Sequence, residues 1–142
     1  MSLPKIAVTM GDPAGVGPEV CLHLLQDEEI ARLCTPVVFG DAAVLDQAAV
    51  QCRLAKPDKV VAGLGEADAP SVFDIGAIGL RDFETGTANA ATGRAGYTYV
   101  ENAIDAALGG QVAAVTTAPL NKEALHAAGI SFPGHTEIFA AR

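Results

Sequence analysis

Short apolar runs alternate with segments of helical period along this chain. Runs rich in β-branched residues occupy 5–10, 36–40 and 112–117, and weaker ones occupy 60–61 and 71–74. Between and after these runs, apolar residues recur every three to four positions, which predicts helices with one buried face. Strands that alternate with helices predict parallel β-α-β units and an α/β fold with a covered, largely parallel sheet.

The helical segments also have recognisable starts. The first begins near Pro18, because proline suits a first helical turn, and the second follows Asp41, whose carboxylate we expect to cap it, and runs to about Cys52. Val20, Leu24, Ile30 and Leu33 are expected to form the buried face of the first. A third helix begins near Ala88 and is expected to bury Ala91, Ala95, Tyr99, Ala103, Ala106 and Ala107.

The C-terminal third has two distinctive features. The run 112–117 lacks polar alternation, so we predict a strand that is buried on both faces. A short helix over 119–128 follows, and another, capped by Thr136, has made less than two turns at Arg142. Because so short a helix is not stable alone, we expect residues 1–142 to be one part of a longer protein.

Composition narrows the class of protein. The 142 residues are 50% hydrophobic and 18% charged, with a mean hydropathy of +0.31, which predicts one domain with a buried core. The net charge of −8 argues against electrostatic binding to nucleic acid or anionic lipid, and the 5% aromatic content with no Trp leaves few surfaces for base stacking. We expect a small-molecule ligand.

Targeting and cysteine signals point to one compartment. The N-terminal apolar run ends at Thr9, too early for a signal peptide, and no apolar stretch is long enough to span a membrane. Cys21, Cys34 and Cys52 are odd in number and share no C-x-x-C spacing, which is typical of free thiols in a reducing compartment. We therefore expect a cytoplasmic protein.

The segment GDPAGVGPE at 11–19 joins the first strand to the first helix, where α/β proteins place ligand sites. It is no Walker A loop, and Val20 stands where the dinucleotide fingerprint needs its third glycine. Its glycines and prolines specify a rigid backbone. A tight turn without a ligand is the alternative interpretation.

The segment TTAPLNK at 116–122 has the same position after a later strand. Thr117, Asn121 and Lys122 would present a hydroxyl, an amide and an ammonium group beyond the carboxyl end of the sheet. A lysine at a helix N-terminus opposes the usual charge preference, which a bound phosphate or carboxylate would offset. An ordinary exposed lysine explains it equally well.

The segment GHTE at 134–137 again opens a helix. His135 adds a donor that titrates near neutral pH, although a lone histidine is more often structural. His23 and His126 lie inside helical segments and are expected at the surface. Neither a metal-ligand spacing nor a Ser-His-Asp arrangement is found in the sequence, and no catalytic residue is assigned.

Together the segments 9–19, 116–122 and 129–137 resemble the 4-hydroxythreonine-4-phosphate dehydrogenases of vitamin B6 synthesis in their order, their spacing and their local sequence. This resemblance implies a three-layer α/β/α fold related to isocitrate and isopropylmalate dehydrogenases. It also implies a homodimer that uses NAD or NADP and a divalent metal (Zn, Mg or Co) to oxidise and decarboxylate 4-phosphohydroxythreonine in pyridoxal phosphate synthesis.

The resemblance assigns roles to particular residues. His135 and Thr136 match the segment that contacts substrate in this family, and Asp12, Thr117, Asn121 and Lys122 are expected to line the same cleft. Members of the family are a little over twice as long as this chain, with their metal ligands and most of the nucleotide site further along. The resemblance therefore implies that 1–142 is the N-terminal part of a longer dehydrogenase and is inactive alone, with no metal ligand of its own.

Three alternatives stay open. The enzyme would act on a phosphorylated sugar acid such as threonate or erythronate 4-phosphate, since paralogues of the family do so. The chain would instead be a truncated, non-catalytic relative that binds an anion or another chain. An acyl-phosphate transferase on a related fold is the third, with only the missing nucleotide fingerprint in its favour.

Overall fold

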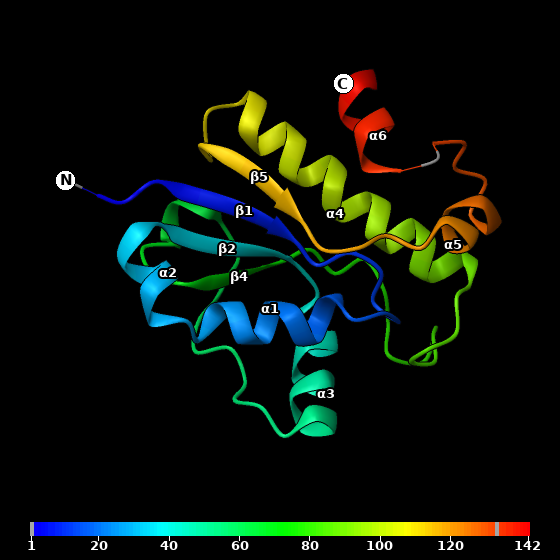
Figure 1. The fold of residues 1–142 in the computed structure, drawn as a ribbon, viewed down its shortest axis with the longest axis horizontal. Helices are drawn as coiled ribbons and strands as arrows, with labels where there is room; N and C mark the ends of the chain where they lie inside the picture. The colour runs from blue at the N-terminus through cyan, green and yellow to red at the C-terminus, as the bar shows by residue number, and fades with distance from the viewer. Residues whose placement is uncertain (1, 133) are drawn as a thin grey trace.

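Strand β1 (Lys5–Thr9) lies inside a five-stranded parallel sheet whose order is β3-β4-β2-β1-β5. The computed structural model describes residues 2–132 and 134–142. The remaining strands are β2 (Thr35–Gly40), β3 (Val60–Val61), β4 (Ser71–Asp74) and β5 (Ala114–Thr117). The parallel sheet and the three-layer α/β/α architecture are confirmed, with α1 and α3 below the sheet and α4 above it in Figure 1.

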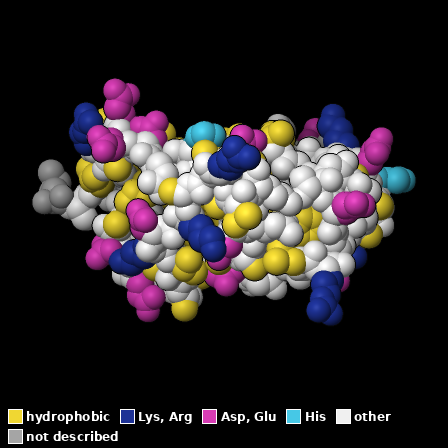
Figure 2. All heavy atoms as spheres, turned by 90° about the horizontal axis from the view of Figure 1, so that it is seen from below, with side chains coloured by type: hydrophobic (Ala, Val, Ile, Leu, Met, Phe, Trp, Pro, Cys, Tyr) yellow, Lys and Arg dark blue, Asp and Glu magenta, His cyan; other side chains and the backbone are white. Residues whose placement is uncertain are grey.

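The helices are α1 (Gly17–Leu25), α2 (Glu28–Leu33), α3 (Ala42–Cys52), α4 (Ala90–Leu108), α5 (Lys122–Ala127) and α6 (His135–Ala141), with a 3₁₀ turn at Leu64–Glu66. None of the helices in the described part of the chain is long and apolar enough to cross a membrane. On the face seen in Figure 2, charged side chains of both signs are scattered and form no continuous basic patch.

The core is built around β2, all of whose residues are buried. Parallel strands covered on both faces read as continuous apolar runs, as β2 does. Phe39 pairs in register with Phe73 on β4, and the rings meet edge to face with centroids 5.1 Å apart. From the other side, α4 lays Ala95, Tyr99, Ala103 and Ala106 on the sheet, so the predicted alanine face is confirmed, although Ala91 and Ala107 are only half-buried.

The segment predicted to be the first helix forms two helices, α1 and α2, and the prediction of its buried residues was wrong. Val20 is 52% exposed and Leu33 is 74% exposed, while Cys21, Leu22 and Leu25 are buried. The chain turns at Asp27, whose carboxylate accepts the amide hydrogens of Glu29 and Ile30 and so starts α2 in a new direction. A single helical period therefore does not carry across 18–33.

The prediction that residues 112–117 are buried on both faces was also wrong. Ala114 and Thr116 are exposed in β5, while Val115 and Thr117 are half-buried. In the described part of the chain β5 pairs only with β1, so it lies at an edge of the sheet. An apolar run indicates a strand but does not report how many neighbours cover it.

Three predicted helix starts also need correction. Asp41 precedes α3 but its carboxylate does not cap it; the Ala42 amide donates instead to Asp74 Oδ1 at 3.1 Å. The helix expected from Pro119 begins only at Lys122, capped by Asn121. Thr136 lies inside α6, because Gly134 holds the extended N-cap position. His23 and His126 are exposed, as predicted.

Candidate functional site

The order in which the strands join the sheet reverses at β1: β2 lies on one side of it and β5 on the other. From β1 the chain leads through α1 and α2 to β2 on one side, whereas β5 joins β1 on the other side. Open α/β sheets bind ligands in the crevice at the carboxyl ends of the strands that flank such a reversal. The loops that follow β1 and β5 therefore frame the candidate site.

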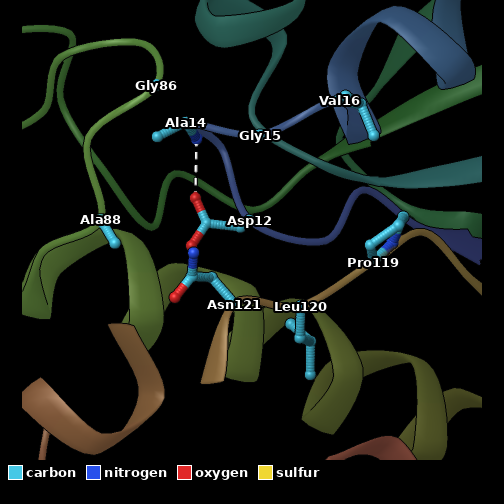
Figure 3. Close-up of a pocket in the computed structure, with 9 residues that line it drawn as sticks. All are labelled: Asp12, Ala14, Gly15, Val16, Gly86, Ala88, Pro119, Leu120 and Asn121. Carbon is cyan, nitrogen blue, oxygen red and sulfur yellow. Dashed lines mark hydrogen bonds between the residues drawn. The ribbon is translucent and has the colours of Figure 1, made fainter. Parts of the chain in front are cut away.

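A cavity of about 240 Å³ lies between these two loops; we call it the switch-point pocket. Its walls come from the loop after β1, the loop before α4 and the loop after β5 (Figure 3). They consist of Asp12, Ala14, Gly15, Val16, Gly86, Ala88, Pro119, Leu120 and Asn121.

Backbone contacts hold the three loops together. The amide of Asp12 donates to the carbonyl oxygen of Pro119 at 3.0 Å, and the amide of Gly86 donates to that of Ala14 at 2.8 Å. Gly11 has φ +74°, and a Cβ there would lie 2.4 Å from the Pro119 carbonyl oxygen. Only glycine allows this conformation and this close approach, so the loop needs a glycine at this position.

Asp12 lies at the base of the pocket and is only 4% exposed. Its Oδ1 accepts the amide hydrogen of Ala14 at 2.8 Å, while Oδ2 is buried without a hydrogen-bond partner among the described residues. Burial raises the pKa of this carboxyl group above its ordinary value, opposed by the Ala14 amide and the Thr92 hydroxyl. A buried carboxylate with an open acceptor is costly, and such groups gather at functional sites.

Asn121 reaches the same pocket from the β5 side. Its Oδ1 accepts the amide hydrogen of Ala124 at 2.9 Å, which caps α5 and fixes the side chain. The side chains of Asp12 and Asn121 point toward each other in Figure 3. The structure thus brings together two residues that are 109 positions apart, from two of the three segments that the sequence singled out.

His135 begins α6 and is half-buried, and it is not among the residues that line the switch-point pocket. Burial lowers the pKa of its imidazole below the ordinary value, opposed by a hydrogen bond with the backbone of Ala118. Nε2 is buried and has no hydrogen-bond partner among the described residues. In a neutral imidazole one ring nitrogen donates and the other accepts, so the tautomer decides which role Nε2 plays.

The other predicted site residues do not line the switch-point pocket. Thr117 ends β5 and is half-buried, and Lys122 and Thr136 are exposed on the first turns of α5 and α6. Lys122 has no salt bridge within 2–132 and 134–142. No group of three or more His, Cys, Asp or Glu side chains within those ranges could hold a metal ion.

Sequence reasoning missed one part of the pocket wall and one buried contact outside the pocket. Gly86 and Ala88 line the pocket, and the only local signal was the Asn89 N-cap with Thr92, which forms a capping box before α4. Asp41 is 2% exposed, accepts the amide hydrogen of Ala77 at 2.9 Å and accepts the hydroxyl of Tyr99. Nothing in the sequence pattern pairs Asp41 with a tyrosine 58 residues away.

The sequence is similar to those of known dehydrogenases. Over 140–142 residues the chain is 39% identical to the 4-hydroxythreonine-4-phosphate dehydrogenase of Trichlorobacter lovleyi and to a Symbiobacterium thermophilum protein named provisionally as a D-threonate 4-phosphate dehydrogenase. Each match covers 96% of this chain and 42% of the relative, so the chain spans less than half the length of these curated relatives.

A solved structure gives the same result in three dimensions. The crystal structure of a 4-hydroxythreonine-4-phosphate dehydrogenase from Burkholderia phymatum superposes with a TM-score of 0.89 at 38% identity, over 99% of this chain and 44% of that one. Residues 32–142 match the family described as pyridoxal phosphate biosynthetic protein PdxA. The chain therefore belongs to the PdxA family.

Proposed function

We propose that the protein containing this chain oxidises and decarboxylates 4-phosphohydroxythreonine with NAD or NADP in pyridoxal phosphate synthesis. The observation that carries the proposal is family membership across the whole described fold, at 38–39% identity to proteins named for this activity. Two of the three segments that prompted the resemblance, 9–19 and 116–122, also meet at the carboxyl ends of β1 and β5, where α/β enzymes bind small molecules, and His135 of the third lies against the backbone of Ala118.

His135 and Thr136 would contact the substrate. A His135 imidazole with a lowered pKa is neutral at pH 7, so its Nε2 can accept a hydrogen bond from a substrate hydroxyl in the tautomer that carries its hydrogen on Nδ1. Thr136, on the exposed first turn of α6, would add a hydroxyl on the same side. Lys122 is exposed and its ammonium group is available to the phosphate or carboxylate of the substrate.

The pocket is a partial fit for the cofactor. The loop after β1 lacks the dinucleotide glycine fingerprint, but Asp12 Oδ2 offers an acceptor for the hydroxyl or amide groups that a dinucleotide carries. When bound, NAD(P) supplies the acceptor for the hydride of the secondary alcohol. The described residues do not fit a divalent metal, so they suggest no step that uses one.

A second substrate has equal support from sequence identity. The relative named provisionally as a D-threonate 4-phosphate dehydrogenase is 39% identical, the same value as the 4-hydroxythreonine-4-phosphate dehydrogenase. Both compounds are phosphorylated hydroxy acids, and they differ in that only hydroxythreonine carries an amino group. A cytoplasmic homodimer completes the proposal, on the family resemblance alone.

The test is substrate profiling of the protein expressed from its native gene, read by NAD(P)H formation with each phosphorylated acid. His135→Ala should lower kcat/KM by tenfold or more, because it removes an acceptor that a bound hydroxyl needs. His126→Ala is the matched control, since His126 is an exposed histidine on the neighbouring helix α5. An unchanged kcat/KM in His135→Ala would remove His135 from the substrate site.

The intact mass of the natively produced protein comes first. A mass near or above twice 14.4 kDa supports the proposal that residues 1–142 are part of a longer dehydrogenase. A mass of 14.4 kDa would contradict it and favour the non-catalytic alternative.

A further inference from the structure

The acceptor and the donor of the switch-point pocket form a complementary pair. Asp12 is fixed by the Ala14 amide on Oδ1, which leaves Oδ2 as an acceptor with no described partner. Asn121 is fixed by the Ala124 amide on its Oδ1, which leaves the amide nitrogen as a donor. Each side chain is thus oriented by one bond and faces the pocket with its other polar atom (Figure 3).

Asp12 Oδ2 has no hydrogen-bond partner by geometry among the described residues, although the Thr92 hydroxyl lies near enough to lower the pKa of the carboxyl group. The hydroxyl of Thr92, which also lies near, donates to the carbonyl oxygen of Asn89 at 2.9 Å and accepts the Asn89 amide hydrogen at 3.1 Å. Asp12 also forms no salt bridge within 2–132 and 134–142. An acceptor buried in this state costs free energy that a bound donor would recover.

The chemistry of the pair selects the ligand group. A carboxylate oxygen repels phosphate and carboxylate groups, so the anionic end of a ligand is excluded from this pocket. A group that both donates and accepts would satisfy Asp12 and Asn121 at once, and hydroxyl and primary amide groups do both. Oδ2 is closed to solvent in this conformation, so a ligand group reaches it when the exposed Asn121 side chain rotates while its Oδ1 keeps the bond to the Ala124 amide.

We propose that Asp12 and Asn121 together bind one hydroxyl or primary amide group of a ligand. The Asp12 carboxylate accepts its hydrogen, and the Asn121 amide donates to its oxygen. The inference rests on the proposed function, which provides two sources of such a group: a hydroxyl of the phosphorylated acid, or a ribose hydroxyl or carboxamide of the dinucleotide. The phosphate of either ligand lies outside the switch-point pocket.

Three variants test the pair. In Asp12→Asn, the Ala14 amide keeps the side-chain oxygen, so an NH₂ group replaces the free acceptor. In Asn121→Asp, the new carboxylate still caps α5 through the Ala124 amide, and its second oxygen replaces the donor. The double variant exchanges the two roles and restores one donor and one acceptor. Asp58→Asn, at an exposed position, is the charge-matched control.

The readout is the Kd, by isothermal titration calorimetry, of NAD⁺, 4-phosphohydroxythreonine and D-threonate 4-phosphate. The protein is expressed from its native gene. Each single variant should weaken one ligand class by about tenfold or more, and the double variant should recover most of that loss. Weakened NAD⁺ binding identifies the dinucleotide as the source, and weakened binding of a phosphorylated acid identifies the substrate. In Asp12→Asn, inorganic phosphate should compete more strongly, because the repelling charge is gone.

Two results would overturn the inference. Wild-type binding that Asp12→Asn leaves unchanged for all three compounds refutes the Asp12–Asn121 site and leaves the proposed function intact. Losses in the single variants without recovery in the double variant refute the paired role. A wild-type protein that binds none of the compounds refutes the proposed function, and this inference falls with it.

Discussion

Removing one buried hydroxyl should cost this fold a measurable share of its stability. Tyr99 on α4 is fully buried, and its hydroxyl donates to Oδ2 of Asp41, which is itself 2% exposed. Asp41 also accepts the amide hydrogen of Ala77 at 2.9 Å. This one carboxylate therefore ties α4 to the end of β2 and to the segment after β4. We predict that Tyr99→Phe destabilises the protein through Asp41.

The size of the loss follows from what the substitution removes. Phenylalanine retains the ring, so the packing against the sheet stays and no cavity larger than one oxygen atom forms. The lost bond joins a neutral donor to a buried acceptor that carries charge, for which mutational series give about 1.5–3 kcal/mol. The Ala77 amide stays bonded to Asp41, which keeps the carboxylate partly satisfied and places the expected loss inside this range.

Urea unfolding followed by circular dichroism measures the free energy of unfolding directly, provided that the slope with urea is the same in both proteins. Tyr97→Phe is the matched control on the same helix, because Tyr97 is only half-buried and stacks on Phe132 through its ring. It should change stability by less than about 0.5 kcal/mol. A Tyr99→Phe protein as stable as the wild type would refute the assignment of Asp41 as a structural acceptor.

Three further predictions concern Tyr99, Asp12 and Gly17. Tyr99 ionises above pH 10 in the unfolded chain, whereas burial and Asp41 hold its pKa higher in the folded protein. The free energy of unfolding should therefore fall by about 1.4 kcal/mol per pH unit above about pH 10. Tyr99→Phe should lack this loss in matched urea titrations. Burial also raises the pKa of Asp12 in the folded protein, so the stability that protonated Asp12 provides below about pH 4 is lost as the pH rises. The free energy of unfolding of Asp12→Asn should therefore increase relative to that of the wild type from about pH 4 to 7. A variant that is less stable than the wild type at every pH would contradict this. Gly17→Ala should destabilise by about 1–3 kcal/mol, because its Cβ would lie 1.8 Å from the Met10 carbonyl oxygen, whereas Gly65→Ala meets open space and should change little by the same assay.

Local pattern predicted the elements well wherever a single segment carried the signal. Each of the five predicted strands forms, and α3 ends at Cys52 as expected, because strand runs and helical periods are properties of neighbouring residues. The errors fall where the answer depends on distant partners. β5 is apolar yet lies at an edge, and Asp41 follows a strand yet bonds to Tyr99 rather than capping α3.

The candidate site divides in the same way. Asp12, Asn121 and His135 could be named from the sequence because each follows a glycine, proline or strand signal, and Asn121 and His135 also lie within the residues 32–142 that match the PdxA family. The sequence could not show which of these residues lie close together in space. The loops after β1 and β5 come into contact only because these two strands are neighbours in the sheet. The loop before α4 then adds Gly86 and Ala88 to the wall of the switch-point pocket.

The sequence by itself determined the α/β class, the positions of the strands and the rigid loop at 11–19, since these rest on propensity, period and backbone freedom along the chain. The tertiary structure alone decided which polar atoms have partners. Burial and hydrogen bonding depend on residues far apart in the sequence, and they leave Asp12 Oδ2 and His135 Nε2 without partners among the described residues.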